Sequence, residues 1–393
     1  MSTLKPILIN LPNLLSMINS QQDPRFDCIK KTISQTTRYW FRAVRQIPTA
    51  LDWISRGGSF YDPWNRTVGS RFAMPQLTEF RESFEQCCDR RAAEIVLDLE
   101  KDNRELLLLW SGGIDSTTVL ISLLKAGLDQ SRLRILLSRH SIEEYPDFFL
   151  NNIEKHCRWQ DILEFAQEQN NEQDYWLISG AFGDNILSGG RNATEFHRAT
   201  GIDSDQTWLN HQAAIRDFLW PQDRPQGQWF MGELLRHIQS QELAITTLGD
   251  FFWYLHFNFR WLEVDLRRGY EIDLWGLNQK NDPDLVSKTL DRSVKFFDHE
   301  SFQLWSMNNL GSEKTHRKIQ AKQYILDWTQ DRVYYETKQK EPSMPRISDL
   351  KYFPLVVTED LRQYRTLTGG QLFELVCGLD RDHRSMSLRS KIN

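Results

Sequence analysis

The sequence predicts an α/β fold in which a mostly parallel sheet is flanked by helices. Three observations favour this fold: an unbroken apolar run at 106–110, two further apolar runs at 133–137 and 176–178, and helical patterns between and after these runs. Short unbroken apolar runs are typical of strands that are covered on both faces, as in a parallel sheet. Strands that alternate with helical patterns predict βαβ units.

The first elements along the chain are less regular. Residues 1–76 mix apolar and aromatic positions with turn signals and show no dominant period, so we expect an irregular, partly helical N-terminal layer. Over 77–100, apolar residues recur every three or four positions, which predicts a helix. The strand at 106–110 and a helix at 116–126 follow, and Gly127 stands where a left-handed cap would end that helix.

The C-terminal part, from about residue 201, is predicted to be helical and rich in aromatic residues. Bulky aromatic side chains at this density usually belong to a core, so we expect them to pack in the interior rather than to form a ligand-binding box. The tryptophans concerned are Trp208, Trp220, Trp229, Trp253, Trp261, Trp275, Trp305 and Trp328.

Composition limits the classes of function. A chain of 393 residues has a length typical of about two domains. Its 48 basic and 53 acidic residues give a net charge of −5 without a concentrated basic tract, which argues against nucleic-acid binding as the main activity. The five cysteines form no C-x-x-C pair, so neither a disulfide framework nor a zinc site is expected. Mean hydropathy is −0.54 and no apolar run is long enough to span a bilayer, so we expect a soluble, cytoplasmic protein that does not bind membranes.

The strongest chemical signal lies between the predicted strand at 106–110 and the next helix, and reads Ser111-Gly112-Gly113-Ile114-Asp115-Ser116. Two glycines allow a sharp turn with exposed amides, the serines supply hydroxyl groups, and the start of a helix favours an anion. We therefore expect the glycines and serines to bind pyrophosphate, and Asp115 to hold a Mg²⁺ ion that bridges the phosphates. Gly113 is expected to need backbone angles that a β-branched residue cannot adopt. The alternative is an ordinary turn with a capping aspartate.

This loop resembles the SGGxDS loop of the PP-loop, or adenine nucleotide α-hydrolase, superfamily, whose members cleave ATP to AMP and pyrophosphate. A second segment, Ile178-Ser179-Gly180-Ala181-Phe182-Gly183-Asp184-Asn185-Ile186-Leu187-Ser188-Gly189-Gly190, looks like the SGxGxDExxxGG segment of asparagine synthetase and β-lactam synthetase. The resemblance covers roughly residues 77–343 and implies a synthetase domain at 77–393 with a PP-loop ATP-pyrophosphatase-like sheet, with Gly180 at the nucleotide and Asp184 as a second Mg²⁺ ligand. Because both aspartates follow parallel strands, we expect them to face one crevice.

Two looser matches follow in the family's order. Phe296-Phe297-Asp298-His299-Glu300 resembles the family's PFLD segment, and Lys338-Gln339-Lys340-Glu341 resembles its RxKE segment. The likeness implies two catalytic lysines: Lys340 would stabilise negative charge as an acyl-adenylate is attacked, and Lys318 would hold pyrophosphate. It also implies that Ser138, after the second strand, contacts the adenosine. The alternative for both lysines is a solvated helix face.

The sequence also departs from this family. Asparagine synthetases begin with a glutaminase domain whose nucleophile is a cysteine after Met1, whereas this chain has Ser2 and only 76 residues before the family-like part. Glutamine is therefore not the expected nitrogen source within this chain. Ala181 stands where the family has a glutamate or tyrosine that activates the amine, and Asn185 replaces the acid of the family's DE pair.

The resemblance thus implies a ligase that uses ATP and Mg²⁺. A small-molecule or peptide carboxylate would be adenylated with release of pyrophosphate, and an amine or ammonia would then displace AMP to form an amide. A separate protein could supply the ammonia. The changes at Ala181 and Asn185 keep an alternative open, a non-catalytic ATP- or AMP-binding subunit or sensor of a modification complex. A tRNA-modifying PP-loop enzyme ranks third, because the paired cysteines of sulfur transfer are missing.

Overall fold

The structure, a computed structural model of the whole chain, describes the chain in part. The described residues are 73–102, 104–162, 164–165, 175–187, 190–219, 224–240, 242–259, 261, 264, 292–310 and 318–338, with short strands at 5–10, 60–61, 67–68 and 352–357. Most of the N-terminal layer expected at 1–76 lies outside these residues.

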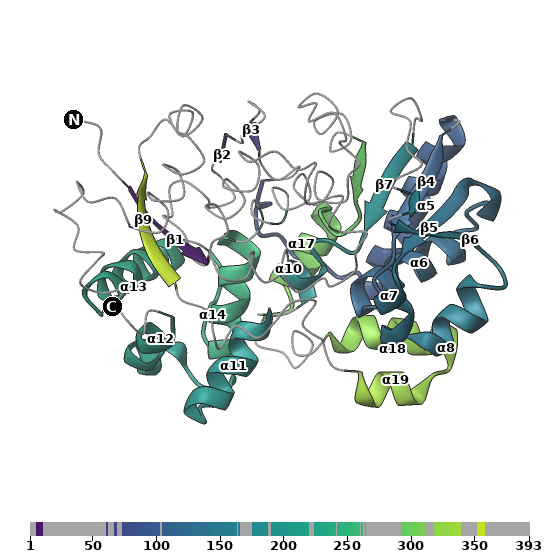
Figure 1. The fold of residues 1–393 in the computed structure, drawn as a ribbon. Coiled ribbons are helices and arrows are strands. Elements are labelled where there is room, and N and C mark those ends of the chain that lie inside the picture. The colour runs from purple at the N-terminus through teal and green to yellow at the C-terminus, as the bar shows by residue number, and fades with distance from the viewer. Residues whose placement is uncertain are drawn as a thin grey trace. The chain divides into compact units, whose positions relative to one another are not determined.

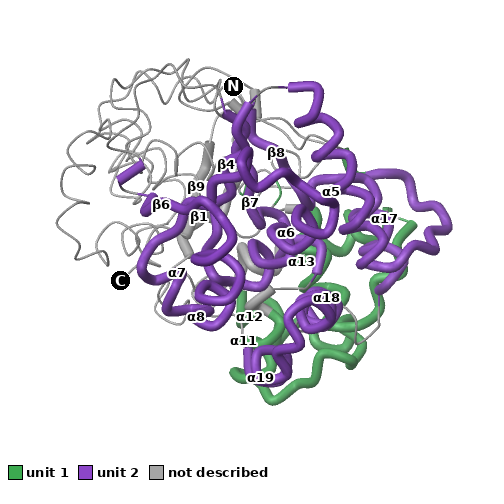
Figure 2. Tube along the Cα trace, turned by 90° about the vertical axis from the view of Figure 1, so that its right-hand side faces the viewer, with its two compact units in different colours: residues 1–74, 189–270, 342–393 green, residues 75–188, 271–341 purple. Residues whose placement is uncertain are grey.

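The chain divides into two compact units, which Figure 2 shows in two colours. Unit 1 comprises residues 1–74, 189–270 and 342–393, and unit 2 comprises residues 75–188 and 271–341. The first glycine-rich motif, residues 178–188 of the second and Lys318 belong to unit 2.

Unit 2 is built on a five-stranded parallel sheet, visible in Figure 1. The strand order is β6-β5-β4-β7-β8. The strands are β4 (Glu105–Leu109), β5 (Leu133–Leu137), β6 (Arg158–Asp161), β7 (Tyr175–Ser179) and β8 (Ser293–Lys295). The predicted α/β class and the three predicted strands are confirmed. The bounds of β4 and β7 differ from the prediction by one residue at each end, and those of β5 agree.

The two edge strands were not predicted. β6 has the sequence RWQD with two exposed positions, and β8 has only three residues, one of them buried. Edge strands pair with only one strand and are more exposed to solvent, so they lack the mainly apolar sequence of a central strand.

The order of the strands creates a switch point between β4 and β7. From β4 the chain winds outward through β5 to β6, and it then returns to β7 on the other side of β4. Leu109 at the end of β4 pairs with Ser179 at the end of β7, so the loops that follow these strands start side by side. Open α/β sheets bind ligands at such a point.

Three helices of unit 2 pack together. They are α5 (Phe84–Lys101), α6 (Ile114–Lys125) and α18 (Ile319–Thr329). The predicted start of α5 at residue 77 is wrong, because a capping box fixes it at Ser83: the Ser83 Oγ accepts from the Gln86 amide at 3.1 Å, and the Gln86 side chain accepts from the Ser83 amide at 2.8 Å. After α6, Gly127 has φ +78, which confirms the predicted left-handed cap.

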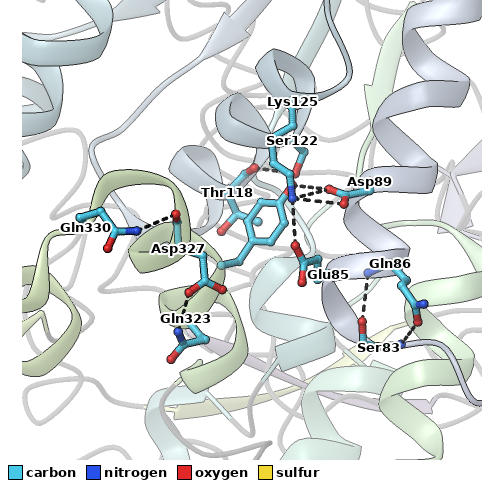
Figure 3. Close-up of polar contacts among 11 residues, drawn as sticks. Ser83, Glu85, Gln86, Asp89, Thr118, Ser122, Lys125, Gln323, Asp327 and Gln330 are labelled. Carbon is cyan, nitrogen blue, oxygen red and sulfur yellow. Dashed lines mark hydrogen bonds and ion pairs between the residues drawn. The ribbon is translucent and has the colours of Figure 1, made fainter.

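A polar network joins these helices, as Figure 3 shows. Lys125 Nζ of α6 lies 3.0 Å from the carboxylates of Glu85 and Asp89 on α5. The Tyr324 hydroxyl of α18 donates to Asp89 Oδ1 at 2.7 Å, and Lys125 Nζ lies 4.4 Å from the Tyr324 ring centroid. The network holds α18, whose N-cap is Lys318, against the helix that begins at the glycine loop.

Unit 1 is mainly helical and aromatic in its described part. Its helices of seven or more residues are α11 (Gly190–Thr200), α12 (Gln212–Leu219), α13 (Arg224–Gln239) and α14 (Leu248–Tyr254), and β1 (Lys5–Asn10) pairs antiparallel with β9 (Tyr352–Val357). β2 (Phe60–Tyr61) pairs antiparallel with β3 (Thr67–Val68). Across the described part of both units, no helix combines the length and apolar character that a membrane span needs.

The prediction that the tryptophans pack in the core is confirmed for four of them. Trp208, Trp253, Trp261 and Trp305 are at most 3% exposed. For Trp328 the prediction is wrong, because this side chain on α18 is 41% exposed. The side chains of Trp220, Trp229 and Trp275 lie outside the described residues.

Candidate functional site

The loop after β4 is a tight, internally bonded turn. The Ser111 amide donates to Ser116 Oγ at 3.1 Å, and Ser116 Oγ donates to the Gly113 carbonyl at 3.2 Å. Gly112 has φ +77, and a Cβ there would lie 2.3 Å from the Ser141 carbonyl oxygen, so only glycine fits. Gly113 has φ −79, which any residue can adopt, so the expectation that its backbone angles exclude a β-branched residue is wrong and applies to Gly112 instead.

Helix α6 begins directly on this loop. Gly113 is its N-cap and has no side chain to accept from the amides of the first turn. These amides and the positive end of the helix dipole therefore suit an anion. Asp115 lies in the same first turn.

The loop after β7 packs closely on the first loop. A Cβ on Gly180 would lie 2.5 Å from the Ser116 amide nitrogen, and a Cβ on Gly183 would lie 2.5 Å from Asp115 Cγ. Glycine at both positions thus allows the two loops to touch. Between them Phe182 is buried with φ +69, a conformation that side chains rarely adopt. Helix α10 (Gly183–Leu187) follows and carries Asp184 in its first turn.

Lys318 joins the two loops. This N-cap residue of α18 has a left-handed backbone and is 4% exposed. Its Nζ contacts Asp115 Oδ2 and lies 2.7 Å from Asp184 Oδ1. Burial acts to lower the pKa of the ammonium, but the charges of Asp115 and Asp184 overcome burial and raise the pKa to about 12. Lys318 is therefore a buried cation between two carboxylates, and the alternative of a solvated helix-face lysine is wrong.

A second ion pair lies beside the glycine loop. Lys338 Nζ is 2.9 Å from Glu144 Oε1, and the side chains are 10% and 13% exposed. Glu144 ends α7 (Arg139–Glu144) and faces the loop, since a Cβ on Gly113 would lie 3.4 Å from Glu144 Oε1. Ser138, expected at the adenosine, is the N-cap of α7, where its Oγ accepts from the Ser141 amide at 3.3 Å.

The PFLD-like segment lies beneath the site rather than in it. Phe296 and Phe297 are fully buried, and the Asp298 carboxylate accepts from Gln303 Nε2 at 3.3 Å. Helix α17 (Glu300–Met307) follows, and its Ser306 Oγ donates to the Ile186 carbonyl at 2.5 Å. The segment thereby supports α10, which carries Asp184.

Most of the predicted site residues are brought together. The residues that converge are Ser111, Gly112, Gly113, Asp115, Ser116, Gly180, Asp184 and Lys318. Lys340 lies outside the described residues. Sequence reasoning missed Gly183, Glu144 and Lys338. Gly183 lies in the segment at 178–190 and Lys338 in the segment at 338–341, so these motif matches could have indicated them. Glu144 lies in no matched motif.

The fit to a metal can be tested on the donor set. The described residues hold no group of three or more His, Cys, Asp or Glu side chains that could bind a metal. Asp115 and Asp184 nonetheless bring two carboxylates to one cationic nitrogen. Mg²⁺ at nucleotide sites takes one or two carboxylates and completes its shell with phosphate oxygens and water. The pair fits a Mg²⁺ ion that arrives with a phosphate.

Comparison of the chain with protein-family models, with curated proteins and with solved structures finds no match. The resemblance to the asparagine synthetase branch therefore rests on the motifs of this chain.

Proposed function

We propose that unit 2 binds ATP with Mg²⁺, transfers AMP to a substrate carboxylate with release of pyrophosphate, and then forms an amide with an amine or ammonia. One observation carries the proposal. Two loops at the switch point of a parallel sheet put Asp115 and Asp184 around the Lys318 ammonium, next to the uncapped start of α6. Carboxylates, a cation and a helix start without a side-chain cap at one place match what a metal-bound pyrophosphate requires.

In this proposal each group has a defined part. The amides of the glycine loop and of α6 bind phosphate oxygens. Asp115 and Asp184 hold the Mg²⁺ ion, which would neutralise charge on the departing pyrophosphate. Lys318 keeps its proton, because its pKa is raised to about 12, and gives the leaving group a second positive charge. The resemblance adds Lys340 at the acyl-adenylate.

The reaction class is tested by the products of ATP. The protein is incubated with Mg·ATP, ammonium and a cell-extract metabolite pool, and the nucleotides are quantified by mass spectrometry. AMP is expected from the wild type and from Asp98→Asn, a matched control on the exposed face of α5. Asp115→Asn and Asp184→Asn should abolish AMP formation. Release of ADP, or AMP formation by Asp115→Asn at the wild-type rate, would refute the proposal.

A second candidate is a protein that binds ATP without turning it over. The observation that favours it is the pair of residues that the loop after β7 carries. Ala181 has no group to activate an amine, and a buried Asn185 follows Asp184 where the resembling family has an acid. ATP binding in calorimetry together with no AMP from any carboxylate pool would support this candidate.

Sulfur transfer to tRNA is less well supported. Burial raises the pKa of Cys87 to about 12 and that of Cys157 to about 11, and burial also raises the pKa of Cys88. These thiols stay protonated near neutral pH and are poor nucleophiles.

A further inference from the structure

Tyr334 carries a buried hydroxyl group that bonds to none of the residues the structure describes. The residue lies on α19 (Arg332–Thr337) and is 6% exposed. Buried hydroxyl groups almost always have a partner, because an unpaired donor loses its hydrogen bonds to water without compensation. This hydroxyl therefore needs a partner that the described residues do not supply.

The tyrosine ring is held firmly in place. The Tyr145 ring stacks on it with centroids 3.9 Å apart and planes 15° apart. Asp331 secures both residues, since its Oδ1 accepts from the Tyr334 amide at 2.9 Å and its Oδ2 accepts from the Tyr145 hydroxyl at 3.0 Å. Lys338 Nζ lies 5.9 Å from the Tyr334 ring centroid. A ring fixed in this way aims its hydroxyl in one direction.

A series of contacts leads from this ring to the glycine loop. Lys338 Nζ lies near the Tyr334 ring and pairs with Glu144 at 2.9 Å, and Glu144 Oε1 would lie 3.4 Å from a Cβ on Gly113. Burial is the main cause that raises the pKa of the Tyr334 hydroxyl, and the charges of Tyr145, Glu144 and Asp115 raise it further, so the hydroxyl remains a donor at physiological pH. Lys338 pairs with Glu144, whereas Lys318 pairs with both Asp115 and Asp184, so one negative charge remains and a phosphate would approach together with Mg²⁺.

We propose that the Tyr334 hydroxyl donates a hydrogen bond to a phosphate oxygen of the nucleotide bound at the glycine loop, which makes α19 part of the phosphate site. The inference rests on the proposed ATP site and adds a ligand from a helix without any recognised motif. A substrate carboxylate offers the same kind of acceptor oxygen, and the experiment separates the two sources.

The test is calorimetric titration of the full chain with Mg²⁺ and inorganic pyrophosphate, and separately with Mg·ATP, without any carboxylate substrate. Tyr334→Phe should weaken both affinities about tenfold or more, the usual loss for a hydrogen bond to a charged group. Tyr335→Phe, which removes the neighbouring hydroxyl on the same helix, is the matched control and should bind as the wild type does. Because Tyr334→Phe removes an unpaired hydroxyl, its Tm without ligand should equal or exceed that of the wild type.

The outcomes separate the two proposals. If the wild type binds ATP and pyrophosphate and Tyr334→Phe binds them equally well, the inference is wrong and the ATP site stands. Unchanged binding of pyrophosphate combined with a higher KM for the carboxylate would assign the hydroxyl to that substrate and also overturn the inference. If the wild type binds neither ligand, both proposals fail. A lower Tm of the ligand-free variant would show a structural role instead.

Discussion

Replacing Lys318 with methionine removes the ammonium that lies between Asp115 and Asp184 while keeping a side chain of similar length. Removing one partner of a buried ion pair destabilises a protein by about 3–5 kcal/mol, because the other charge stays buried without compensation. The carboxylates of Asp115 and Asp184 are 18% and 34% exposed, so water relieves part of the repulsion and the lower end of that range applies. A domain of the size of unit 2 loses roughly 2–4 °C in Tm per kcal/mol of stability, so the Tm should fall by about 6–12 °C.

The assay is thermal unfolding followed by circular dichroism near neutral pH without nucleotide. The matched control is Lys101→Met, whose side chain is 75% exposed and pairs with Asp98 at 3.3 Å. Its Tm should change by no more than about 1–2 °C, as is usual for a surface ion pair. If Lys318→Met unfolds at the same temperature as this control, the ammonium does not stabilise the site and the reasoning from its burial is refuted.

Two additions separate charge from packing. Mg²⁺ alone should raise the Tm of Lys318→Met more than that of the wild type, because the ion can take the place of the ammonium between the carboxylates. Adding Asp184→Asn to Lys318→Met should restore part of the lost stability, because one of the two opposed charges is then gone. If neither addition restores stability, the lower Tm of Lys318→Met comes from lost packing of the lysine side chain.

Three further predictions follow. The free energy of unfolding should fall as the pH is raised through about 12. The Lys318 ammonium has a pKa that rises from 10.5 to about 12 on folding, so it stabilises the protein fully only below about pH 10.5. The loss, about 2 kcal/mol in chemical denaturation, should be missing in Lys318→Met. Gly183→Ala should weaken Mg·ATP binding in calorimetry, because its Cβ would lie 2.5 Å from Asp115 Cγ, whereas Gly232→Ala, with open space around it, should bind normally. Lys340→Ala should lower the steady-state rate of AMP release, which accompanies amide formation, but leave ATP affinity within about twofold, because its proposed contact strengthens only in the transition state; an equal loss of affinity would assign this lysine to nucleotide binding.

The central strands could be predicted because their physical signal is local. β4, β5 and β7 are central strands in which most residues are buried, so their sequences are mainly apolar. β6 and β8 owe their strand conformation to the neighbour that they pair with, which no short window of sequence reveals. The start of α5 was placed too early because apolar periodicity continues before Ser83, where the capping box decides the boundary.

Some residues of the candidate site could likewise be predicted from local sequence, and others could not. Asp115 and Asp184 could be expected to meet, because parallel strands end at one edge of a sheet. Glu144 and Lys338 stand 194 positions apart and lie on segments with no pattern that links them. Their pairing, like the stacking of Tyr145 on Tyr334, depends on how α19 packs, so it became visible only in three dimensions.

Under the proposed function, the charges of the site give a reason for the nucleotide and the metal to bind together. Asp115 and Asp184 carry two negative charges against the single positive charge of Lys318, while Glu144 and Lys338 cancel each other. A polyphosphate that approached alone would meet a site with an excess negative charge in a partly buried place, where repulsion is poorly screened. Under the proposed function, a divalent cation would turn that excess into a net positive charge. The lysine is then the counter-ion that allows two aspartates to stay close before ligand arrives, and its buried, left-handed backbone position would keep the ammonium beside the proposed pyrophosphate.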